Sequence, residues 1–182
     1  MMTEKIILRN FTIKDINKVY LQSLNNKKLM QYSENRFRTF NKNNCLKYYK
    51  LMKKNKNFFF LVSKKSEVEN FYVPIGTLAG YVDYNNKTCD LGILIWENKK
   101  GYGQVAWQKA IQKIFKKKYV RKITAGTMAN NKGMIMLFKK SKMKFELKKK
   151  KMFIYKKKFI DMIGYSIFKE EYKKRKNYQN NK

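Results

Sequence analysis

The sequence predicts one α+β domain built on a single sheet. Its 182 residues are enough to bury a core, and 43% of them are apolar. Segments with alternating apolar residues, typical of strands, are interspersed with segments in which apolar residues recur every three or four positions, typical of helices. A long apolar hairpin occupies the middle of the chain. Its antiparallel strands argue against a repeated βαβ architecture.

The expected elements follow one another without an internal repeat or a linker. The strands are predicted at residues 5–11, 57–65, 120–128, 144–155 and 158–168, and the hairpin at 73–96 with its turn at 84–87. The helices are predicted at residues 13–24, 41–54, 101–118 and 130–142, with a short helix after the first. Thr12 is expected to cap the first helix. We expect the domain to span residues 1–172, followed by a basic, frayed tail at 173–182.

Lysine dominates a strongly basic composition. The formal net charge is +32, with 39 Lys and 5 Arg. Such a charge attracts nucleic acid, but Lys, Asn, Tyr, Phe and Ile are also the residues that A/T-rich codons encode. A protein selected to contact phosphates usually carries more Arg, which grips phosphate at two points. We therefore expect a solvated basic surface that binds nucleic acid only nonspecifically and attracts small anionic ligands.

Several classes of protein are disfavoured by composition. No apolar run approaches the roughly 20 residues that a membrane span requires, so no membrane partner is expected. The N-terminal residues lack a secretory pattern. Two dispersed cysteines and no histidine argue against a disulfide framework and against a metal site. We expect a cytoplasmic protein with reduced thiols, as a monomer or homodimer.

Residues 96–107, WENKKGYGQVAW, place two glycines between an apolar strand and a helix. Backbone N–H groups at such a turn, together with the helix dipole, can bind an anion. A P-loop would need a Lys-Ser or Lys-Thr pair that is absent here, and a dinucleotide fold would need a preceding βαβ unit. A glycine needed only for the geometry of the turn remains an alternative.

The chain resembles the GNAT superfamily of acyl-CoA N-acetyltransferases. The family's pyrophosphate loop, Q/R-x-x-G-x-G/A, is similar to residues 98–103, which match both glycines and have Asn98 in the first place. The segments LRNFTIKDI, the central hairpin and ANNKGMIMLFKKSKMKFE resemble family segments in the same order. The ending resembles the branch that holds ribosomal-protein N-terminal acetyltransferases and nucleotide-amino-sugar acetyltransferases. The resemblance implies a mixed, mostly antiparallel sheet with helices on both faces and splayed fourth and fifth strands.

The resemblance also implies that acetyl-CoA is the co-substrate and that no metal takes part. The backbone of Leu94 and Trp96 would pair with the pantetheine, and the Trp96 N–H would stabilise the oxyanion as a catalytic donor. The cofactor-binding residues expected on this basis are Leu94, Ile95, Trp96, Asn98, Lys100, Gly101, Tyr102, Gly103, Gln104, Asn131 and Phe138.

The attacking amine must lose a proton, and Asp90 is the first candidate for the base. It stands where histone-acetylating relatives carry a glutamate; the alternative is that it only ends the hairpin turn. Glu97 and Asp83 are lesser candidates. Phe138 stands where many relatives have a tyrosine that protonates the departing thiolate, so that acid is missing or lies elsewhere.

The acceptor is expected to contact residues 31–40. This segment offers a ring, a carboxylate, an amide and a guanidinium, a mixture that suits a sugar carrying hydroxyls and phosphate; the expected substrate-binding residues are Tyr32, Glu34, Asn35 and Arg36. The sequence thus predicts an N-acetyltransferase that acts by direct transfer on a nucleotide-linked amino sugar. The alternatives are a protein N-terminal or small-amine acetyltransferase, and a non-catalytic relative that binds nucleic acid.

Overall fold

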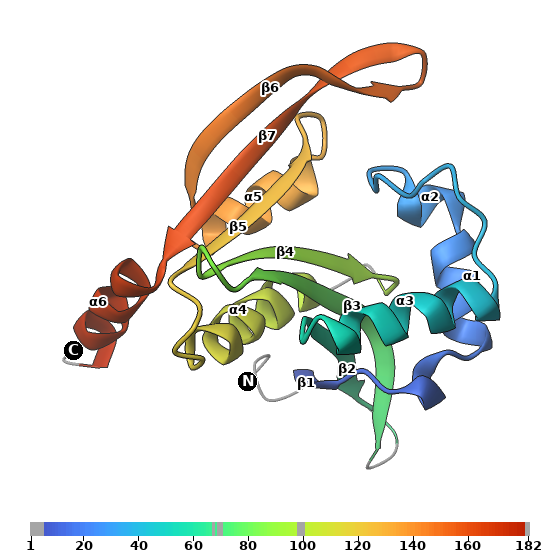
Figure 1. The fold of residues 1–182 in the computed structure, drawn as a ribbon, viewed down its shortest axis with the longest axis horizontal. Helices are drawn as coiled ribbons and strands as arrows, with labels where there is room; N and C mark the ends of the chain where they lie inside the picture. Colours follow the sequence, from blue (N-terminus) through green and yellow to red (C-terminus); the bar gives the residue numbers. More distant parts are fainter. Residues whose placement is uncertain (1–5, 67, 69–70, 98–100, 181–182) are drawn as a thin grey trace. The chain divides into compact units, whose positions relative to one another are not determined.

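A computed structural model describes residues 6–66, 68, 71–97 and 101–180 (Figure 1). The strands of these residues are β1 Ile6–Asn10, β2 Phe58–Lys65, β3 Tyr72–Asp83, β4 Thr88–Ile95, β5 Lys122–Met128, β6 Lys144–Tyr155 and β7 Lys158–Phe168. The helices are a 3₁₀ helix at Ile13–Asp15, α1 Lys18–Asn25, α2 Lys27–Met30, α3 Lys42–Lys54, α4 Tyr102–Phe115, α5 Lys132–Lys140 and α6 Lys169–Asn180.

The strands are hydrogen-bonded in the order β1-β2-β3-β4-β5-β7-β6. The pairs β1–β2, β2–β3, β5–β7 and β6–β7 are antiparallel, whereas β4 and β5 are parallel. This mixed, mostly antiparallel sheet confirms the predicted α+β class. Contacts divide the chain into two compact units, residues 1–81 with 93–106 and residues 82–92 with 107–182. The single domain over 1–172 and the splay of β4 from β5 stay predictions.

The first unit buries an aromatic core between β1, β2, α1 and α3. Phe11 stacks on Phe59 with ring centroids 4.1 Å apart and lies 5.0 Å from the Tyr20 ring. Cys45 and Leu61 are buried in the same cluster. These residues come from the apolar positions of the strands and helices predicted by periodicity. Their burial removes aromatic area from water, the main stabilising contribution to such a unit.

A buried carboxylate closes the N-terminal corner of this unit. Asp15 accepts two bonds from the Arg9 guanidinium, at 2.6 and 2.7 Å, and bonds from the N–H and hydroxyl of Thr12 at 2.7 and 2.9 Å. Thr12 occupies the N-cap position of the short helix, as predicted, and its N–H and hydroxyl donate to the carboxylate of the third helical residue. Burial works to raise the pKa of Asp15, but the bonds from Arg9 and Thr12 outweigh it and lower the pKa below its usual value.

We expect Asp15→Asn to reduce the free energy of unfolding by about 2 kcal/mol at pH 7, because four bonds to a charged group are weakened. A lowered pKa gives stability that is present above the unfolded value of about 3.9 and is lost as pH falls through the folded value. Urea denaturation of wild type and variant should therefore converge below about pH 4. An equal deficit at pH 7 and pH 3 would rule out the ionised carboxylate as its source.

The second unit builds its core around Trp107, which is completely buried on α4. Its ring centroid lies 5.8 Å from that of Phe138, which in turn lies 5.1 Å from that of Tyr165. Ile123 of β5 and Ile167 of β7 are register partners and are also buried. One face of the β5–β7 ladder is therefore apolar and covered, and the opposite face is free to carry polar side chains.

Two helices end in a Schellman motif with lysine where glycine is the usual residue. After α5, Lys142 has φ 59°, its N–H donates to the Lys139 carbonyl, and the Met143 N–H donates to the Phe138 carbonyl. Lys56 has φ 51° and ends α3 in the same way. The lysines with positive φ are Lys56, Lys87, Lys142, Lys151, Lys156 and Lys157. Each holds a backbone conformation that costs an L-residue roughly 1 kcal/mol.

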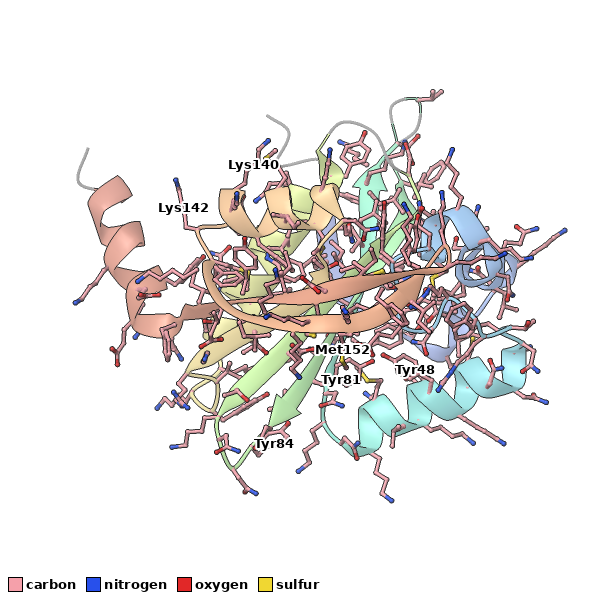
Figure 2. The ribbon with its side chains drawn as sticks, turned by 90° about the horizontal axis from the view of Figure 1, so that it is seen from above. Tyr48, Tyr81, Tyr84, Lys140, Lys142 and Met152 are labelled. Carbon is pink, nitrogen blue, oxygen red and sulfur yellow. The ribbon has the colours of Figure 1, made fainter. Side chains whose placement is uncertain are left out.

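We expect Lys142→Gly to raise the free energy of unfolding by about 1 kcal/mol, since glycine adopts positive φ without strain. Lys142 extends away from the ribbon at the surface, so little packing is lost (Figure 2). Lys140→Gly is the matched control: it removes a neighbouring exposed lysine from helical backbone, and should cost about 1 kcal/mol. Thermal unfolding of the two variants should move in opposite directions. Destabilisation by both would mean that strain at residue 142 is negligible.

The structure differs from the sequence prediction at two places. The helix expected at 13–24 is divided, because the Asn17 side chain accepts from the Tyr20 N–H and starts α1 as a separate helix. In the segment expected to be a frayed tail, α6 extends through Lys169–Asn180, with Glu170 and Glu171 in its first turn. Two acidic residues at a helix N-terminus complement the helix dipole, which favours the helix.

Candidate functional site

The glycine turn predicted to bind phosphate lies directly before α4. Gly101 has φ 73°, and its carbonyl accepts from the N–H groups of Gln104 and Val105 at 3.1 and 3.4 Å. Apart from its neighbours in the chain, no described residue lies within 4 Å of a Cβ built on Gly101. Gly103 is the second residue of the helix, and Tyr102 is buried beside it. A glycine turn with open space in front and a helix N-terminus behind is a suitable site for an anion.

Two of the predicted cofactor residues, Asn98 and Lys100, lie outside the described residues. On the strand side of the turn, Glu97 forms an ion pair with Lys64 at 2.5 Å, and Lys64 Nζ lies 5.8 Å from the centre of the Tyr102 ring. This pairing ties Glu97 to a cation. It makes Glu97 a weaker candidate for a proton acceptor than a carboxylate held by neutral donors.

The backbone of β4 next to the turn does not present the donor that the sequence predicted. The Trp96 N–H donates to the Ile75 carbonyl at 2.9 Å, and its indole N–H donates to the Pro74 carbonyl at 3.1 Å. Both donors of Trp96 are therefore used by β3 and its N–H cannot serve as the oxyanion donor in this arrangement. Because successive N–H groups of a strand point to opposite edges, the N–H of Ile95 points away from β3.

Gly76 lets β4 lie this close to β3. A Cβ built on Gly76 would be 2.5 Å from the Leu94 carbonyl oxygen and 3.2 Å from the Ile95 Cα. Only glycine fits here without movement of the backbone. Gly76 was not among the predicted site residues, because nothing in the sequence relates residue 76 to residue 94 beyond their place in one hairpin.

Asp90, the predicted base, lies in the second unit near the start of β4. Its Oδ1 accepts a hydrogen bond from the Thr124 hydroxyl at 2.8 Å, and the two residues are partners in the parallel β4–β5 pairing. Asp90 is exposed, whereas its neighbour Cys89 is buried. Burial, with a smaller contribution from the Asp90 charge, raises the pKa of Cys89 to about 12, so that thiol stays protonated near neutral pH. The predicted role of Asp90 remains a prediction.

Asn131 and Phe138 have structural roles in α5. The Asn131 side-chain oxygen accepts from the Met134 N–H at 3.2 Å, and its amide nitrogen donates to the Thr127 hydroxyl at 3.0 Å. Asn131 is thus the N-cap of the helix. Phe138 is fully buried between the rings of Trp107 and Tyr165. These contacts give both residues a role in stabilising the fold. Their predicted contacts with the co-substrate stay predictions.

The segment predicted to bind the acceptor forms a series of turns between α2 and α3, in the first unit. The Asn35 N–H donates to the Ser33 hydroxyl at 3.1 Å, and Arg36 donates to the Ser33 carbonyl at 3.0 Å. The Arg36 guanidinium carbon lies 4.4 Å from the ring centre of Phe37, which is 79% exposed. Tyr32 is half-buried and Glu34 is exposed. The predicted polar groups therefore lie on a hydrogen-bonded turn and are at least partly exposed.

A pair of tyrosines escaped the sequence prediction. The hydroxyl oxygens of Tyr48 on α3 and Tyr81 on β3 are 2.7 Å apart (Figure 2). Burial, followed by the hydrogen bond with Tyr81, raises the pKa of Tyr48 well above its ordinary value. The Tyr48 hydroxyl therefore stays protonated near neutral pH and takes part in the pair as a hydrogen-bonding group. No sequence signal links two residues 33 positions apart on different elements.

Neither a membrane span nor a metal centre emerges from the described part of the chain. None of its helices is both long and apolar enough to cross a bilayer. None of its His, Cys, Asp and Glu residues form a group of three or more that could hold a metal ion.

Comparison with known proteins identifies a family. The family model described as an acetyltransferase (GNAT) domain matches residues 5–144. No curated protein matches the chain by sequence. Among solved structures, spermidine N-acetyltransferase from Vibrio cholerae, in complex with CoA and spermine, has a TM-score of 0.79 at 19% identity, covering 93% of this chain and 98% of its own.

Two further structures are similar. RimL, a ribosomal-protein α-N-acetyltransferase in complex with coenzyme A, has a TM-score of 0.79 at 14% identity, covering 94% of this chain and 98% of its own. The yncA protein from Salmonella typhimurium, solved with acetyl-CoA, has a TM-score of 0.76 at 13% identity, covering 92% and 95%. At these identities the likeness establishes the fold.

Proposed function

Because the chain belongs to the GNAT acetyltransferase family and is an acyltransferase with acetyl-CoA as co-substrate, we propose that its acceptor is the primary amine of an anionic small molecule. A nucleotide-linked amino sugar is the first candidate. On this proposal the enzyme belongs to the branch that acetylates amino-sugar nucleotides and ribosomal-protein N-termini. It works in the cytoplasm as a monomer or homodimer, with reduced thiols at Cys45 and Cys89.

The observation that carries this proposal is that carboxylates of this protein, whose net charge is +32, are already paired with cations. Five carboxylates of the described chain form ion pairs with lysine or arginine, namely Asp15, Glu97, Glu146, Asp161 and Glu171. A carboxylate already paired with a cation offers little attraction to a second one. A surface of this kind attracts phosphate-bearing acceptors and repels polycations.

The turn between α2 and α3 supplies the groups that would recognise such an acceptor. Arg36 can pair with phosphate, and Asn35 and Glu34 can bond to sugar hydroxyls. The backbone N–H of Asn35 donates to the Ser33 hydroxyl, and the backbone N–H of Arg36 donates to the Ser33 carbonyl. A rigid turn bearing exposed polar groups favours a small, hydroxyl-rich ligand over a flexible chain.

The proposed reaction is direct transfer. The amine nitrogen forms a bond to the thioester carbonyl carbon, the carbon–sulfur bond breaks, and the amine proton passes to Asp90. The Ile95 N–H is the proposed donor to the carbonyl oxygen, in place of Trp96. No tyrosine acid is required, because CoA leaves as a thiolate whose ordinary pKa is about 8.5. Asp90 is exposed and can return its proton to water.

A second candidate acceptor is a small polyamine, favoured by the structural likeness to an enzyme solved with spermine. Release of CoA thiol should be measured with three acceptors: a UDP-linked amino sugar, spermidine and a peptide with a free N-terminus. We expect kcat/KM for the sugar nucleotide to exceed that for spermidine on the order of tenfold or more at low salt. The reverse order would overturn the anionic acceptor. Salt-sensitive nucleic-acid binding without any transfer would favour the non-catalytic relative.

A further inference from the structure

One lysine of the first unit contacts both sides of the glycine turn. Lys64 Nζ, near the end of β2, donates to Glu97 Oε1 at 2.5 Å and lies 5.8 Å from the centre of the Tyr102 ring. Glu97 precedes the turn, and Tyr102 is the first residue of α4, directly after Gly101. The side chain of Lys64 therefore joins the strand side of the turn to its helix side.

The contact between Lys64 and Glu97 crosses a strand. Lys64 is the register partner of Val73 on β3. On the other edge of β3, the Ile75 carbonyl accepts from the Trp96 N–H, and Glu97 follows Trp96 in the chain. Neighbouring strands lie about 4.8 Å apart, so only two long side chains can bridge the distance from β2 to the end of β4. All these residues belong to the first unit.

The three contacting side chains are sheltered from solvent to different degrees. The side chains of Lys64 and Glu97 are 20% and 39% exposed, and Tyr102 is 6% exposed. Salt screens partly buried charges less than exposed ones. A cation within about 6 Å of an aromatic ring centre is also attracted to the ring face. Both contacts therefore act more strongly than they would on an open surface.

The glycine turn depends on the direction of its backbone groups. Gly101 holds the left-handed conformation, and its carbonyl accepts from the N–H groups of Gln104 and Val105 in the first turn of α4. N–H groups at such a place bind an anion only when they point to one spot. A site that already holds the bound conformation loses less entropy when the ligand binds. A side chain that links the residue before the turn to the first residue of α4 favours that conformation.

We infer that Lys64 is a positioning residue for the glycine turn: by holding Glu97 and Tyr102 in place, it keeps the N–H groups at the start of α4 directed at a phosphate of acetyl-CoA. The inference rests on the proposed site of acetyl-CoA at this turn and is independent of the acceptor. It differs in sign from a purely electrostatic role. If Lys64 acted only as a positive charge near the anion, removal of the Glu97 carboxylate would strengthen binding, whereas loss of the positioning contact weakens it.

Isothermal titration calorimetry with acetyl-CoA at about 0.15 M salt, where the Debye length is about 8 Å, tests this difference. We expect Lys64→Met to weaken binding about fivefold and Glu97→Gln about threefold, near the upper end of what one partly exposed ion pair contributes. Lys64→Arg keeps the charge and the reach, and should restore most of the affinity. Lys65→Met is the matched control, because it removes the same charge from the next, exposed residue of β2, on the opposite face. Tighter binding by Glu97→Gln, or equal weakening by Lys64→Met and Lys65→Met, would overturn the inference.

Amide hydrogen exchange of the protein without ligand measures the positioning itself. We expect the amides of Gln104 and Val105 to exchange faster in Lys64→Met than in wild type or Lys65→Met, with the amides of α3 unchanged. Unchanged exchange at Gln104 and Val105, or an equal rise in α3, would overturn the inference even if binding were weaker. The variant Gly103→Val separates the inference from the site. Wild-type affinity in Gly103→Val would overturn both, whereas weak binding by Gly103→Val together with wild-type affinity in Lys64→Met would overturn the inference alone.

Discussion

Gly103→Val should weaken acetyl-CoA binding about 100-fold, the loss expected when roughly two charge-assisted hydrogen bonds to phosphate are blocked. Gly103 is the second residue of α4, where backbone N–H groups have no partner within the helix. A branched side chain there would occupy the space through which a phosphate approaches those groups. Isothermal titration calorimetry of wild type and variant at two salt concentrations measures the effect.

The matched control is Gly133→Val. Gly133 is the second residue of α5, and a Cβ built on it would meet only the Asn131 side-chain oxygen, at 3.8 Å. The two variants therefore make the same change at the same position of a first helical turn. We expect Gly133→Val to bind acetyl-CoA like wild type, and both to retain wild-type circular dichroism. Equal weakening by both, or binding that salt abolishes in every protein, would mean that lysines rather than the glycine turn attract the ligand.

Gly76→Ala should reduce the free energy of unfolding by about 3 kcal/mol, an overpacking effect at the upper end of its usual range. The new methyl group would lie 2.5 Å from the Leu94 carbonyl oxygen, and only movement of the β4 backbone relieves that overlap. Ile95 follows Leu94 in β4, so this movement should also displace the Ile95 N–H. If that N–H serves as the donor to the carbonyl oxygen, the variant should also have a lower kcat. Urea denaturation and kinetics of the same preparation give both values.

Gly164→Ala provides the comparison for Gly76→Ala. A Cβ on Gly164 would lie 2.9 Å from the Leu147 Cγ, but its close neighbours are all atoms of that one side chain. A side chain can rotate, so this substitution should cost about 1 kcal/mol. A larger loss of unfolding free energy for Gly164→Ala than for Gly76→Ala would show that the backbone at Leu94 moves at little cost.

The sequence predicted those parts of the fold that depend on local patterns. The hairpin expected at 73–96 is formed by β3 and β4, and the turn expected at 84–87 is closed by bonds from Asn86 to Asp83. Alternation and asparagine-rich turns are properties of neighbouring residues. The division of the first helix at Asn17 was missed because an asparagine within a periodic apolar pattern can face solvent or cap a new helix.

The site was predicted less completely, for a physical reason. The direction of the Trp96 N–H depends on which neighbouring strand takes it, a property of the sheet rather than of the segment. The bond between Thr124 and Asp90 joins residues 34 positions apart. Resemblance to a family could indicate the glycine turn, because the residues of that turn are contiguous in the sequence. It could not indicate partners that only the register of β4 and β5 brings together.

Of the six described lysines with positive φ, three lie in the β6–β7 hairpin, and we expect them to influence which part of the native protein opens first. Lys156 and Lys157 form the two-residue turn between β6 and β7 with φ 47° and 62°, where Asn-Gly is the favoured pair, and Lys151 has φ 50°. Residues 153–160 of this hairpin pair only with each other, whereas Met162–Phe168 also pair with β5. A strained strand end that is paired on one edge should open more readily than a strand that is paired on both edges. Its amides should exchange with deuterium first, well before those of β5.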